Sequence, residues 1–466
     1  MDLTHHTFRR LLLVHWKRSH LITTKRFRYK PKWAIHEKRL TNCNHALGHF
    51  DAFYKPVYGQ DWPSVRLSLL SLPKHCAVVN IYGNSAAAQE QLCDLGTSNF
   101  LLDAQTQVSV ENQSTSDDSE LNPENDGKVA TGLPPYALPG SDDVSAANPD
   151  LLEEEALRDG QYSSDDLNVF VPTEKVYSEK DLLLREEISL NSFESRDISL
   201  KVLPAEALNF SQDLRPYVFP SGVVSRFPSP KSHYGTLGYY LMDAASVLPV
   251  LALDVQPTDR VLDLCAAPGG KSYLILQLLH LHEGGRLHCN DSAQARLSRL
   301  KSVLNLYFPK DIIEQVIVTK MDGASEFPVA YNKVLVDVPC NADRHAVTED
   351  DNNLFKVSRT RERLDMVRLQ RELLISALKS CVPGGTVVYS TCTLAPAQND
   401  GVIQAVAEEL WETSEVEFAV QDLTNLRRAL TPTFKFHDKT KYGLTVLPTP
   451  LNNFGPSFVA KLKRTK

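Results

Sequence analysis

Residues 260–272 read Arg-Val-Leu-Asp-Leu-Cys-Ala-Ala-Pro-Gly-Gly-Lys-Ser. The apolar run at 261–264 indicates a buried strand, the Pro-Gly-Gly of 268–270 cannot continue it, and the apolar stretch 273–281 indicates a core-facing helix. In an open parallel sheet, ligands bind where such a strand ends beside the free amides of a helix N-terminus. The stretch therefore predicts a strand–turn–helix unit that binds a nucleotide-like cofactor.

Two phosphate-binding motifs share features with this stretch, and the spacing excludes both. A nucleotide-triphosphate loop also ends in Gly-Lys-Ser, but its first glycine would stand where this chain has Cys265. A dinucleotide fingerprint needs a third glycine, which does not accompany Gly269 and Gly270. The alternative to a cofactor-binding turn is an ordinary strand-to-helix turn with no ligand.

Apolar segments continue in alternation along the chain. Strands are expected at 286–290, 315–319, 333–338 and 385–390, with helices at 292–306, 360–380 and 397–411. Late apolar runs at 416–420 and 457–462 supply two more strands. A helix is expected to begin at 238–246 and to end or kink before Pro249. This alternation predicts an α/β fold with a doubly wound, mostly parallel, seven-stranded sheet.

Charge is unevenly distributed along the 466 residues, although the net charge is only −7. Residues 1–40 are basic and nearly free of acids, which is typical of a mitochondrial transit segment. A basic arm for nucleic acid is the alternative. The eight cysteines include no C-x-x-C pair, so they indicate a reducing compartment and no metal site. Apolar runs are too short to span a membrane.

Composition divides the chain into further parts. Residues 47–102 are expected to form a small N-terminal α/β lead-in. Residues 103–200 are an acidic insert, read as largely disordered, and their negative charge argues against contact with RNA. Regular patterning then fills 205–466, the expected catalytic domain.

Three acidic residues follow the glycine turn at expected strand ends: Asp291, Asp322 and Asp337. A carboxylate about twenty residues beyond a glycine loop suits the two hydroxyls of a ribose, and Asp291 has that spacing. A helix cap is the alternative for Asp291.

Two cysteines, Cys340 and Cys392, also fall at strand ends and should face one crevice. A thiol there can act as a nucleophile if cationic neighbours lower its pKa, and Arg344, His345 and Lys271 are candidates. The alternative is a buried, inert cysteine. We assign that alternative to the remaining cysteines of the sheet region, Cys265, Cys289 and Cys381.

Three motifs in this order carry a family resemblance: residues 262–271, Asp-Val-Pro-Cys at 337–340 and Ser-Thr-Cys-Thr at 390–393. Together they resemble the Nol/Nop/Sun-domain RNA cytosine-5 methyltransferases over 205–466 and, more weakly, 47–102. The segment 339–345 is most similar to the mitochondrial fourth member, a 5-methylcytosine rRNA methyltransferase.

The resemblance implies a Rossmann-like, class I fold that uses S-adenosylmethionine, with an N-terminal extension. It implies that Cys392 attacks the cytosine, that Cys340 assists release of the product, and that Asp337 contacts the base. The implied cofactor-binding residues are Gly269, Gly270, Lys271, Ser272, Asp291, Arg296, Asp322, Gly323 and Asp337.

The resemblance also implies a biological setting. The substrate would be small-subunit ribosomal RNA in the mitochondrial matrix, with a role in ribosome assembly and contacts with mitochondrial ribosomal subunits. A partner resembling mitochondrial transcription-termination factors would direct the enzyme. Five arginines could contact phosphates or form a solvated helix face: Arg359, Arg361, Arg363, Arg368 and Arg371. The alternatives are a mitochondrial transfer-RNA methyltransferase and a non-catalytic assembly scaffold.

Overall fold

The computed structural model describes residues 41–106, 200–233 and 235–466, which belong to one compact unit, Thr41–Lys466. The expected transit segment and nearly all of the acidic insert lie outside the described residues. Within the unit, the main sheet has the strand order β10-β9-β8-β11-β12-β16-β13-β3. The strands are β3 (Val202–Leu203), β8 (Arg260–Asp263), β9 (Arg286–Asn290), β10 (Ile317–Thr319), β11 (Tyr331–Asp337), β12 (Cys381–Thr391), β13 (Phe418–Gln421) and β16 (Ser457–Arg464).

The pairing confirms the predicted doubly wound sheet. Strands β10, β9, β8, β11 and β12 run parallel, whereas β16 is inserted antiparallel between β12 and β13. Three short strands extend the predicted seven: β3 pairs with β13, and a hairpin of β14 (Lys435–Phe436) and β15 (Leu444–Leu447) pairs with β16. Two-residue strands such as β3 and β14 are too short to give an apolar run in the sequence.

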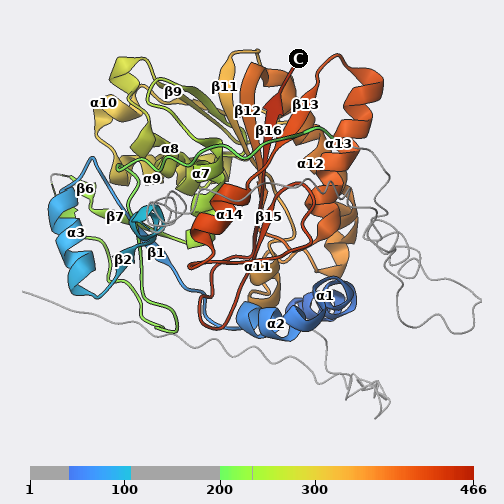
Figure 1. Cartoon of the computed structure of the whole chain (residues 1–466), viewed down its shortest axis with the longest axis horizontal. Helices are drawn as coiled ribbons and strands as arrows, with labels where there is room; N and C mark the ends of the chain where they lie inside the picture. The colour runs from blue at the N-terminus through green and yellow to red at the C-terminus, as the bar shows by residue number, and fades with distance from the viewer. Residues whose placement is uncertain (1–40, 107–199, 234) are drawn as a thin grey trace, which may run out of the picture. The chain divides into compact units, whose positions relative to one another are not determined.

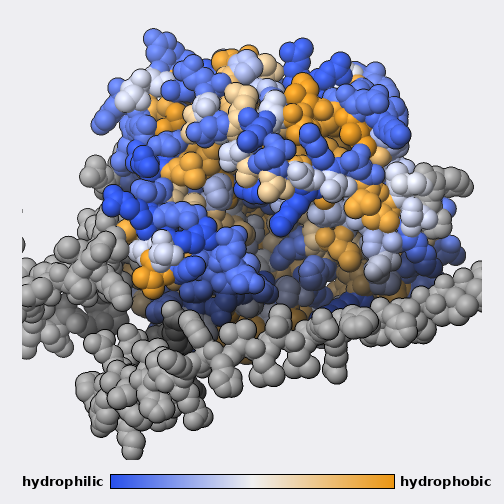
Figure 2. Space-filling view, turned by 180° about the vertical axis from the view of Figure 1, so that it is seen from behind, coloured by the Kyte–Doolittle hydropathy of each residue, from blue (hydrophilic) through white to orange (hydrophobic). Residues whose placement is uncertain are grey.

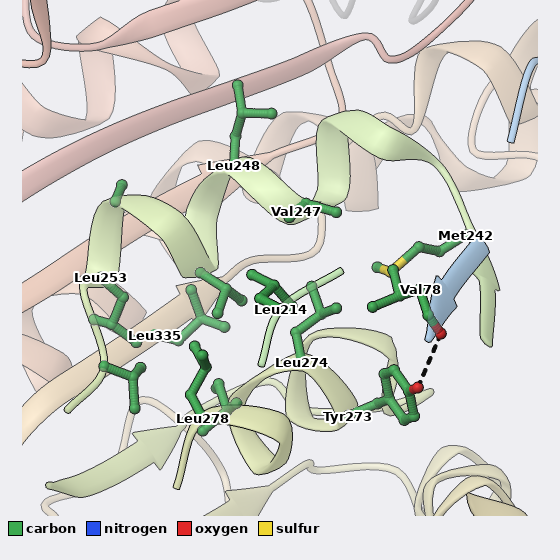
Figure 3. Packing of buried hydrophobic residues seen from close by; sticks show 14 of the residues in the cluster. Val78, Leu214, Met242, Val247, Leu248, Leu253, Tyr273, Leu274, Leu278 and Leu335 are labelled. Carbon is green, nitrogen blue, oxygen red and sulfur yellow. Dashed lines mark hydrogen bonds between the residues drawn. The ribbon is translucent and has the colours of Figure 1, made fainter. Parts of the chain in front are cut away.

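Helices cover both faces of this sheet (Figure 1). One face carries α7 (Leu248–Leu253), α8 (Gly270–Leu278) and α9 (Gln294–Tyr307), and the other carries α12 (Thr360–Ser380) and α13 (Asp400–Thr413). Two further helices are α10 (Lys310–Ile313) and α14 (Thr424–Leu430). Side chains alternate between the faces along each strand. Leu335 of β11 therefore joins the core under α7 and α8 (Figure 3), while Val334 and Val336 join the core under α12.

A second, antiparallel sheet joins chain segments on either side of the undescribed insert. Its order is β2-β4-β1-β7, with β1 (Cys76–Val79), β2 (Ser98–Asn99), β4 (Pro216–Val218) and β7 (Tyr239–Met242). Helix α3 (Ser85–Asp94) and the hairpin β5 (Ser232–His233)–β6 (Thr236–Leu237) flank it. The hydroxyl of Tyr273 in α8 donates to the Val78 carbonyl at 3.0 Å (Figure 3), which ties this sheet to the main core.

The helix expected at 238–246 is wrong. Residues 239–242 form β7, because their aromatic and aliphatic side chains pair with the apolar β1. The Asp243 side chain then accepts a hydrogen bond from the Ala245 amide and caps a short 3-10 turn, Ala244–Val247. Pro249 lies in the first turn of α7, where a backbone donor is not needed, so this proline starts a helix instead of ending one.

The first two described helices pack at the carboxyl-end side of β12. Helices α1 (Asn42–Tyr58) and α2 (Trp62–Leu70) share a buried cluster with α11 (Asp343–Thr348) and with Leu394 and Ala395, just beyond the Thr-Cys motif (Figure 1). The N-terminal helices therefore contact the loop that follows Cys392.

Charged and polar residues dominate the surface seen from behind, with hydrophobic side chains in separate patches (Figure 2). Among the described residues, no helix combines the length and hydropathy that a membrane span requires.

Candidate active site

The three sequence motifs meet at the carboxyl ends of β8, β11 and β12. Asp337, the last residue of β11, lies beside Ser390 of β12 in the parallel register. Lys271 Nζ lies 2.7 Å from one carboxylate oxygen of Asp337, and Ser390 Oγ donates to the other at 2.8 Å. These two contacts fix the orientation of the Asp337 carboxylate in the crevice.

The two motif cysteines are in contact. The Sγ atoms of Cys340 and Cys392 lie 3.2 Å apart, and the Cys392 amide approaches Cys340 Sγ at 3.3 Å. Adjacent parallel strands bring the two loops together, because the Val338 amide donates to the Ser390 carbonyl at 3.1 Å. The carboxyl ends of β11 and β12 therefore present two thiols side by side, next to the Lys271–Asp337 ion pair.

The electrostatic surroundings do not activate Cys392 in the way that the sequence suggested. Part of Cys392 is exposed, but protein groups surround its thiol, and its pKa is raised by the contact with Cys340 and by burial. Of the three expected cations, only Lys271 acts to lower this pKa. Arg344 instead donates to the carbonyls of Ser68 and Gly455 at 2.9 and 2.7 Å. If Cys392 acts as a nucleophile, its thiol must lose a proton although burial and Cys340 both favour the protonated form.

The Asp337 carboxylate stabilises the protonated form of Lys271. Burial lowers the pKa of this ammonium, but the Asp337 carboxylate more than offsets burial, so the pKa of Lys271 is raised. The positive charge is thus maintained within the crevice.

The turn requires glycine at position 269 for geometric reasons. Gly269 has φ +111°, and a Cβ there would lie 2.9 Å from Leu300 Cδ1. A Cβ on Gly270, the first residue of α8, would make an ordinary contact with the ring of Tyr240 at 3.5 Å, so this position does not by itself demand glycine. The backbone at this turn can therefore approach a ligand closely.

Asp291, at the end of β9, is buried and engaged by the glycine-turn loop. Its carboxylate accepts hydrogen bonds from the amides of Ala267 at 3.3 Å and Ala293 at 3.0 Å. Arg296 lies 3.4 Å from the same carboxylate and donates to the Ala267 carbonyl at 2.5 Å. Asp291 and Arg296 therefore shape the loop. Asp291 does not cap α9, because the N-cap residue of that helix is Ala293 and no side chain caps it; the Ala293 contact is a turn bond just before the helix.

Asp322 and Gly323 follow β10. The Asp322 carboxylate is exposed and accepts a hydrogen bond from the Ala324 amide at 3.1 Å. Gly323 is buried, and a Cβ there would lie only 2.6 Å from Leu373 Cδ2 of α12. Asn290 connects this loop to the first motif, because its side-chain amide donates to the carbonyls of Leu264 and Met321, each at 3.1 Å.

Asp263, at the end of β8, is a site residue that the sequence reading did not single out. It is 1% exposed, and Ser272 Oγ donates to its Oδ2 at 2.6 Å. Burial raises the pKa of this carboxyl to about 7, and Oδ1 has no hydrogen-bond partner in the described structure. The signal available in the sequence was an acid enclosed by apolar residues, Leu-Asp-Leu at 262–264.

The residues present fit an amino-acid and nucleoside cofactor. A buried carboxylate oxygen without a partner, a lysine–aspartate pair and a glycine turn that allows close backbone approach lie at neighbouring strand ends. These groups match the ammonium, carboxylate and hydroxyl groups of S-adenosylmethionine.

Acidic neighbours engage most of the five expected phosphate-binding arginines. Arg359 pairs with Glu362 at 2.7 Å, Arg371 pairs with Glu409, and Arg368 lies within 4 Å of Asp365 and Glu372. Arg363 lies over the Phe355 ring, 4.6 Å from its centroid, while Arg361 is exposed. These contacts favour a solvated helix face over a phosphate-binding patch.

The fold and the crevice together define a class of protein. A sheet in which one reversed strand lies beside five parallel strands, with a glycine turn after β8, is the methyltransferase form of the Rossmann-like fold.

Comparison with known proteins identifies the family. Residues 250–463 match the family described as 16S rRNA methyltransferase RsmB/F. The 5-cytosine rRNA methyltransferase NSUN4 of Mus musculus is 34% identical over 94% of this chain and 94% of its own length. The 5-cytosine rRNA methyltransferase nsun-4 of Caenorhabditis elegans is 34% identical over 95% of this chain and 96% of its own length. A mitochondrial tRNA (cytosine(34)-C(5))-methyltransferase of Danio rerio is 41% identical over 54% of this chain and 67% of its own length. The chain belongs to the Sun-domain RNA cytosine-5 methyltransferases and is an S-adenosylmethionine-dependent enzyme of that family.

Proposed function

We propose that this enzyme forms 5-methylcytosine in mitochondrial small-subunit ribosomal RNA through a covalent intermediate on Cys392. The observation that carries the proposal is the pair of thiols 3.2 Å apart beside the Lys271–Asp337 ion pair. Similarity to rRNA methyltransferases extends over nearly the whole chain, whereas similarity to the tRNA enzyme covers about half of it. Ribosomal RNA is therefore the favoured substrate.

The chemistry assigns a separate task to each thiol. Bound S-adenosylmethionine would supply an electrophilic methyl group and would leave as the neutral thioether once the bond between its sulfur and that methyl group breaks. Carbon 5 of cytosine is a weak nucleophile until the Cys392 thiolate adds to carbon 6, which shifts electron density to carbon 5 and allows its bond to the methyl group to form. Carbon 5 then loses its proton and the bond between Cys392 and carbon 6 breaks. Cys340, 3.2 Å from Cys392, would assist this elimination by accepting the carbon 5 proton, and the Cys392 thiolate is regenerated.

Asp337 would hold the base during the addition. Its carboxylate can accept hydrogen bonds from the exocyclic amine and from a protonated ring nitrogen 3, which offsets the negative charge that thiolate addition places on the ring. Lys271 and Ser390 hold the carboxylate in place for this contact.

For the cofactor, we assign the methionine end to residues 269–272 and the ribose hydroxyls to Asp291, supported by Arg296. Asp322 and Gly323 would contact the adenine, and Asp337 would lie near the reacting end. The target base must leave its stack to reach Cys392, so an RNA loop is a better substrate than a duplex.

The cellular setting rests on the sequence and on the relatives. The basic segment 1–40 supports import into the mitochondrial matrix, and one relative is named as mitochondrial. The family resemblance supports a role in ribosome assembly, contacts with mitochondrial ribosomal subunits and a helical-repeat partner similar to mitochondrial transcription-termination factors. Fractionation of cells that express the full chain, followed by capture of associated proteins and RNA, tests these assignments.

The decisive experiment measures transfer of labelled methyl groups to mitochondrial RNA. We expect wild type to label small-subunit ribosomal RNA, Cys392→Ala to be inactive, and Cys340→Ser to accumulate a covalent protein–RNA adduct. Labelling of transfer RNA alone would support the tRNA alternative. Absence of transfer by wild type, with its captured partner present, would favour the scaffold.

A further inference from the structure

A buried carboxylate holds the loop that follows Cys392. Asp343, in the first turn of α11, accepts a hydrogen bond from Thr393 Oγ1 and another from the Leu394 amide, both at 2.7 Å. Both Asp343 and Thr393 are fully buried. The Asp343 amide also approaches the Cys392 carbonyl at 3.4 Å. One residue thus contacts three consecutive residues, beginning with the cysteine itself.

Two tyrosines of α1 reach the same loop from far away in the sequence. Tyr54 Oη lies 3.2 Å from Thr393 Oγ1, and Tyr58 Oη donates to the Leu394 carbonyl at 2.5 Å. Because the Thr393 hydroxyl hydrogen is directed to Asp343, Tyr54 must be the donor in its contact. Both tyrosines are buried. The first described helix therefore supplies part of the wall behind the Thr-Cys motif.

The residue on the other side of Cys392 is fixed as well. Thr391 Oγ1 donates to Asn399 Oδ1 at 2.6 Å, and the Asn399 amide returns a hydrogen bond to the Thr393 carbonyl at 3.0 Å. Side-chain hydrogen bonds thus hold the residues on both sides of Cys392. The backbone of Cys392 is fixed as a result, and its side-chain rotation is the main motion left to it.

We propose that Asp343, Tyr54 and Tyr58 are positioning residues that fix the backbone of Cys392 for attack on the cytosine, so that α1 is a working part of the active site. The proposal rests on the proposed role of Cys392 as the nucleophile. None of the three residues needs to touch substrate, because they act through Thr393 and Leu394.

The carboxylate itself supports a functional reading. The groups that stabilise its charge are the Leu394 amide and the hydroxyls of Thr393 and Tyr54, and no cation is among them. Burial raises the pKa of Asp343 to about 6, so ionisation at neutral pH is unfavourable for folding. A costly buried charge of this kind is typical of functional sites. Here it supplies two acceptor oxygens in a fixed geometry to the loop beyond Cys392.

The test uses the full-length chain and variants that change one polar contact each. Tyr54→Phe, Asp343→Asn and Thr393→Val remove contacts in this network, and Thr393→Ser retains the hydroxyl. Tyr239→Phe and Asp243→Asn are matched controls: Tyr239 Oη donates to the Pro228 carbonyl, and the half-buried Asp243 accepts bonds from the Ala245 and Gly455 amides. Both controls remove equivalent contacts outside the Cys392 loop.

Three quantities distinguish positioning from general stabilisation: the rate of covalent adduct formation in a Cys340→Ser background, the affinity for S-adenosylmethionine, and the thermal midpoint. Displacement of a reacting group by about 1 Å can slow a reaction about 100-fold. We expect Tyr54→Phe, Asp343→Asn and Thr393→Val to slow adduct formation about 10- to 100-fold while cofactor affinity stays within about twofold. Thr393→Ser should restore most of the rate.

Two outcomes would overturn the proposal. In the first, the network variants form adduct as fast as the controls. In the second, the decrease in the rate of adduct formation is proportional to the decrease in the thermal midpoint, with the same relation in the network variants and in the controls. Failure of the proposed function looks different, because wild type would then form no adduct, or Cys392→Ala would still transfer methyl groups.

Discussion

The Sγ atoms of Cys340 and Cys392 lie 3.2 Å apart, although 52 positions separate the two residues in the chain. The parallel pairing of β11 with β12 produces this contact, since each cysteine follows the end of one of these strands. Two thiols so close can bind one reagent together.

A trivalent arsenical such as phenylarsine oxide should therefore inactivate the enzyme, because arsenic bonds to two adjacent thiols at once. A dithiol such as dimercaptopropanol should restore activity. Mass spectrometry of the treated protein should find one arsenical bridging both cysteines, and Cys340→Ser should lose this adduct while Cys93→Ser, at an exposed cysteine, keeps it. Tight binding that persists in Cys340→Ser would contradict the thiol pair.

Lys271→Met should make Cys392 less reactive. The ammonium acts to lower the pKa of Cys392, so its removal should shift the pH midpoint of Cys392 alkylation upward and slow alkylation at any fixed pH below that midpoint. The measurement is the iodoacetamide rate against pH, followed by peptide mapping. Lys301→Met, at an exposed lysine of α9, is the control and should leave the profile in place. An unchanged midpoint in Lys271→Met would show that the ammonium has no influence on the thiol.

Asp263 should make stability depend on pH. Its pKa is about 7 in the folded protein, against 3.8 for an ordinary aspartate, because burial disfavours the charge; Asp337 and Asp291 add to this effect, whereas Ser272 and Lys271 oppose it. Between these two pKa values the folded state binds the proton more tightly. Stability that is fully present below about pH 4 is therefore lost as the pH rises through 7.

Urea unfolding of wild type and Asp263→Asn without cofactor measures this contribution. We expect the stability of wild type relative to the variant to fall between pH 4 and pH 8 by at most roughly 4 kcal/mol. A stability difference that is the same at both pH values would mean that folding does not raise the pKa of Asp263.

Gly323→Ala should destabilise the protein by about 1–3 kcal/mol, because the new Cβ would lie 2.6 Å from Leu373 Cδ2 in a packed region. Gly48→Ala offers the opposite case. Gly48 lies within α1, and a Cβ added there would have no neighbouring atom within 4 Å, so alanine should stabilise the helix by up to about 1 kcal/mol. Chemical denaturation checks both values. Equal effects of the two substitutions would contradict the packing around Gly323.

The sequence predicts most of the main sheet because its strands are apolar runs bounded by turns. It also brings Asp337, Cys340 and Cys392 to one crevice, since carboxyl ends of parallel strands share one edge of a sheet. Other features depend on partners that no local pattern reveals. The local pattern of β7 predicts a helix, and nothing near it in the chain reveals its partner β1, which lies before the insert. Likewise, Tyr54 meets Thr393 across 339 positions.

Electrostatic roles were the least predictable. Arg344 follows the Pro-Cys motif closely, yet its guanidinium turns to the carbonyls of Ser68 and Gly455 because α2 packs against α11. Asp263 could be recognised as unusual only once its complete burial was known.

The pairing of β2 and β1 with β4 and β7 has a consequence for synthesis of the chain. Strand β1 is made early, but both of its edges stay unpaired until 216–218 and 239–242 have been translated. During that interval an apolar Cys-Ala-Val-Val segment is open to aggregation, so a chaperone that shields it should raise the yield of folded protein.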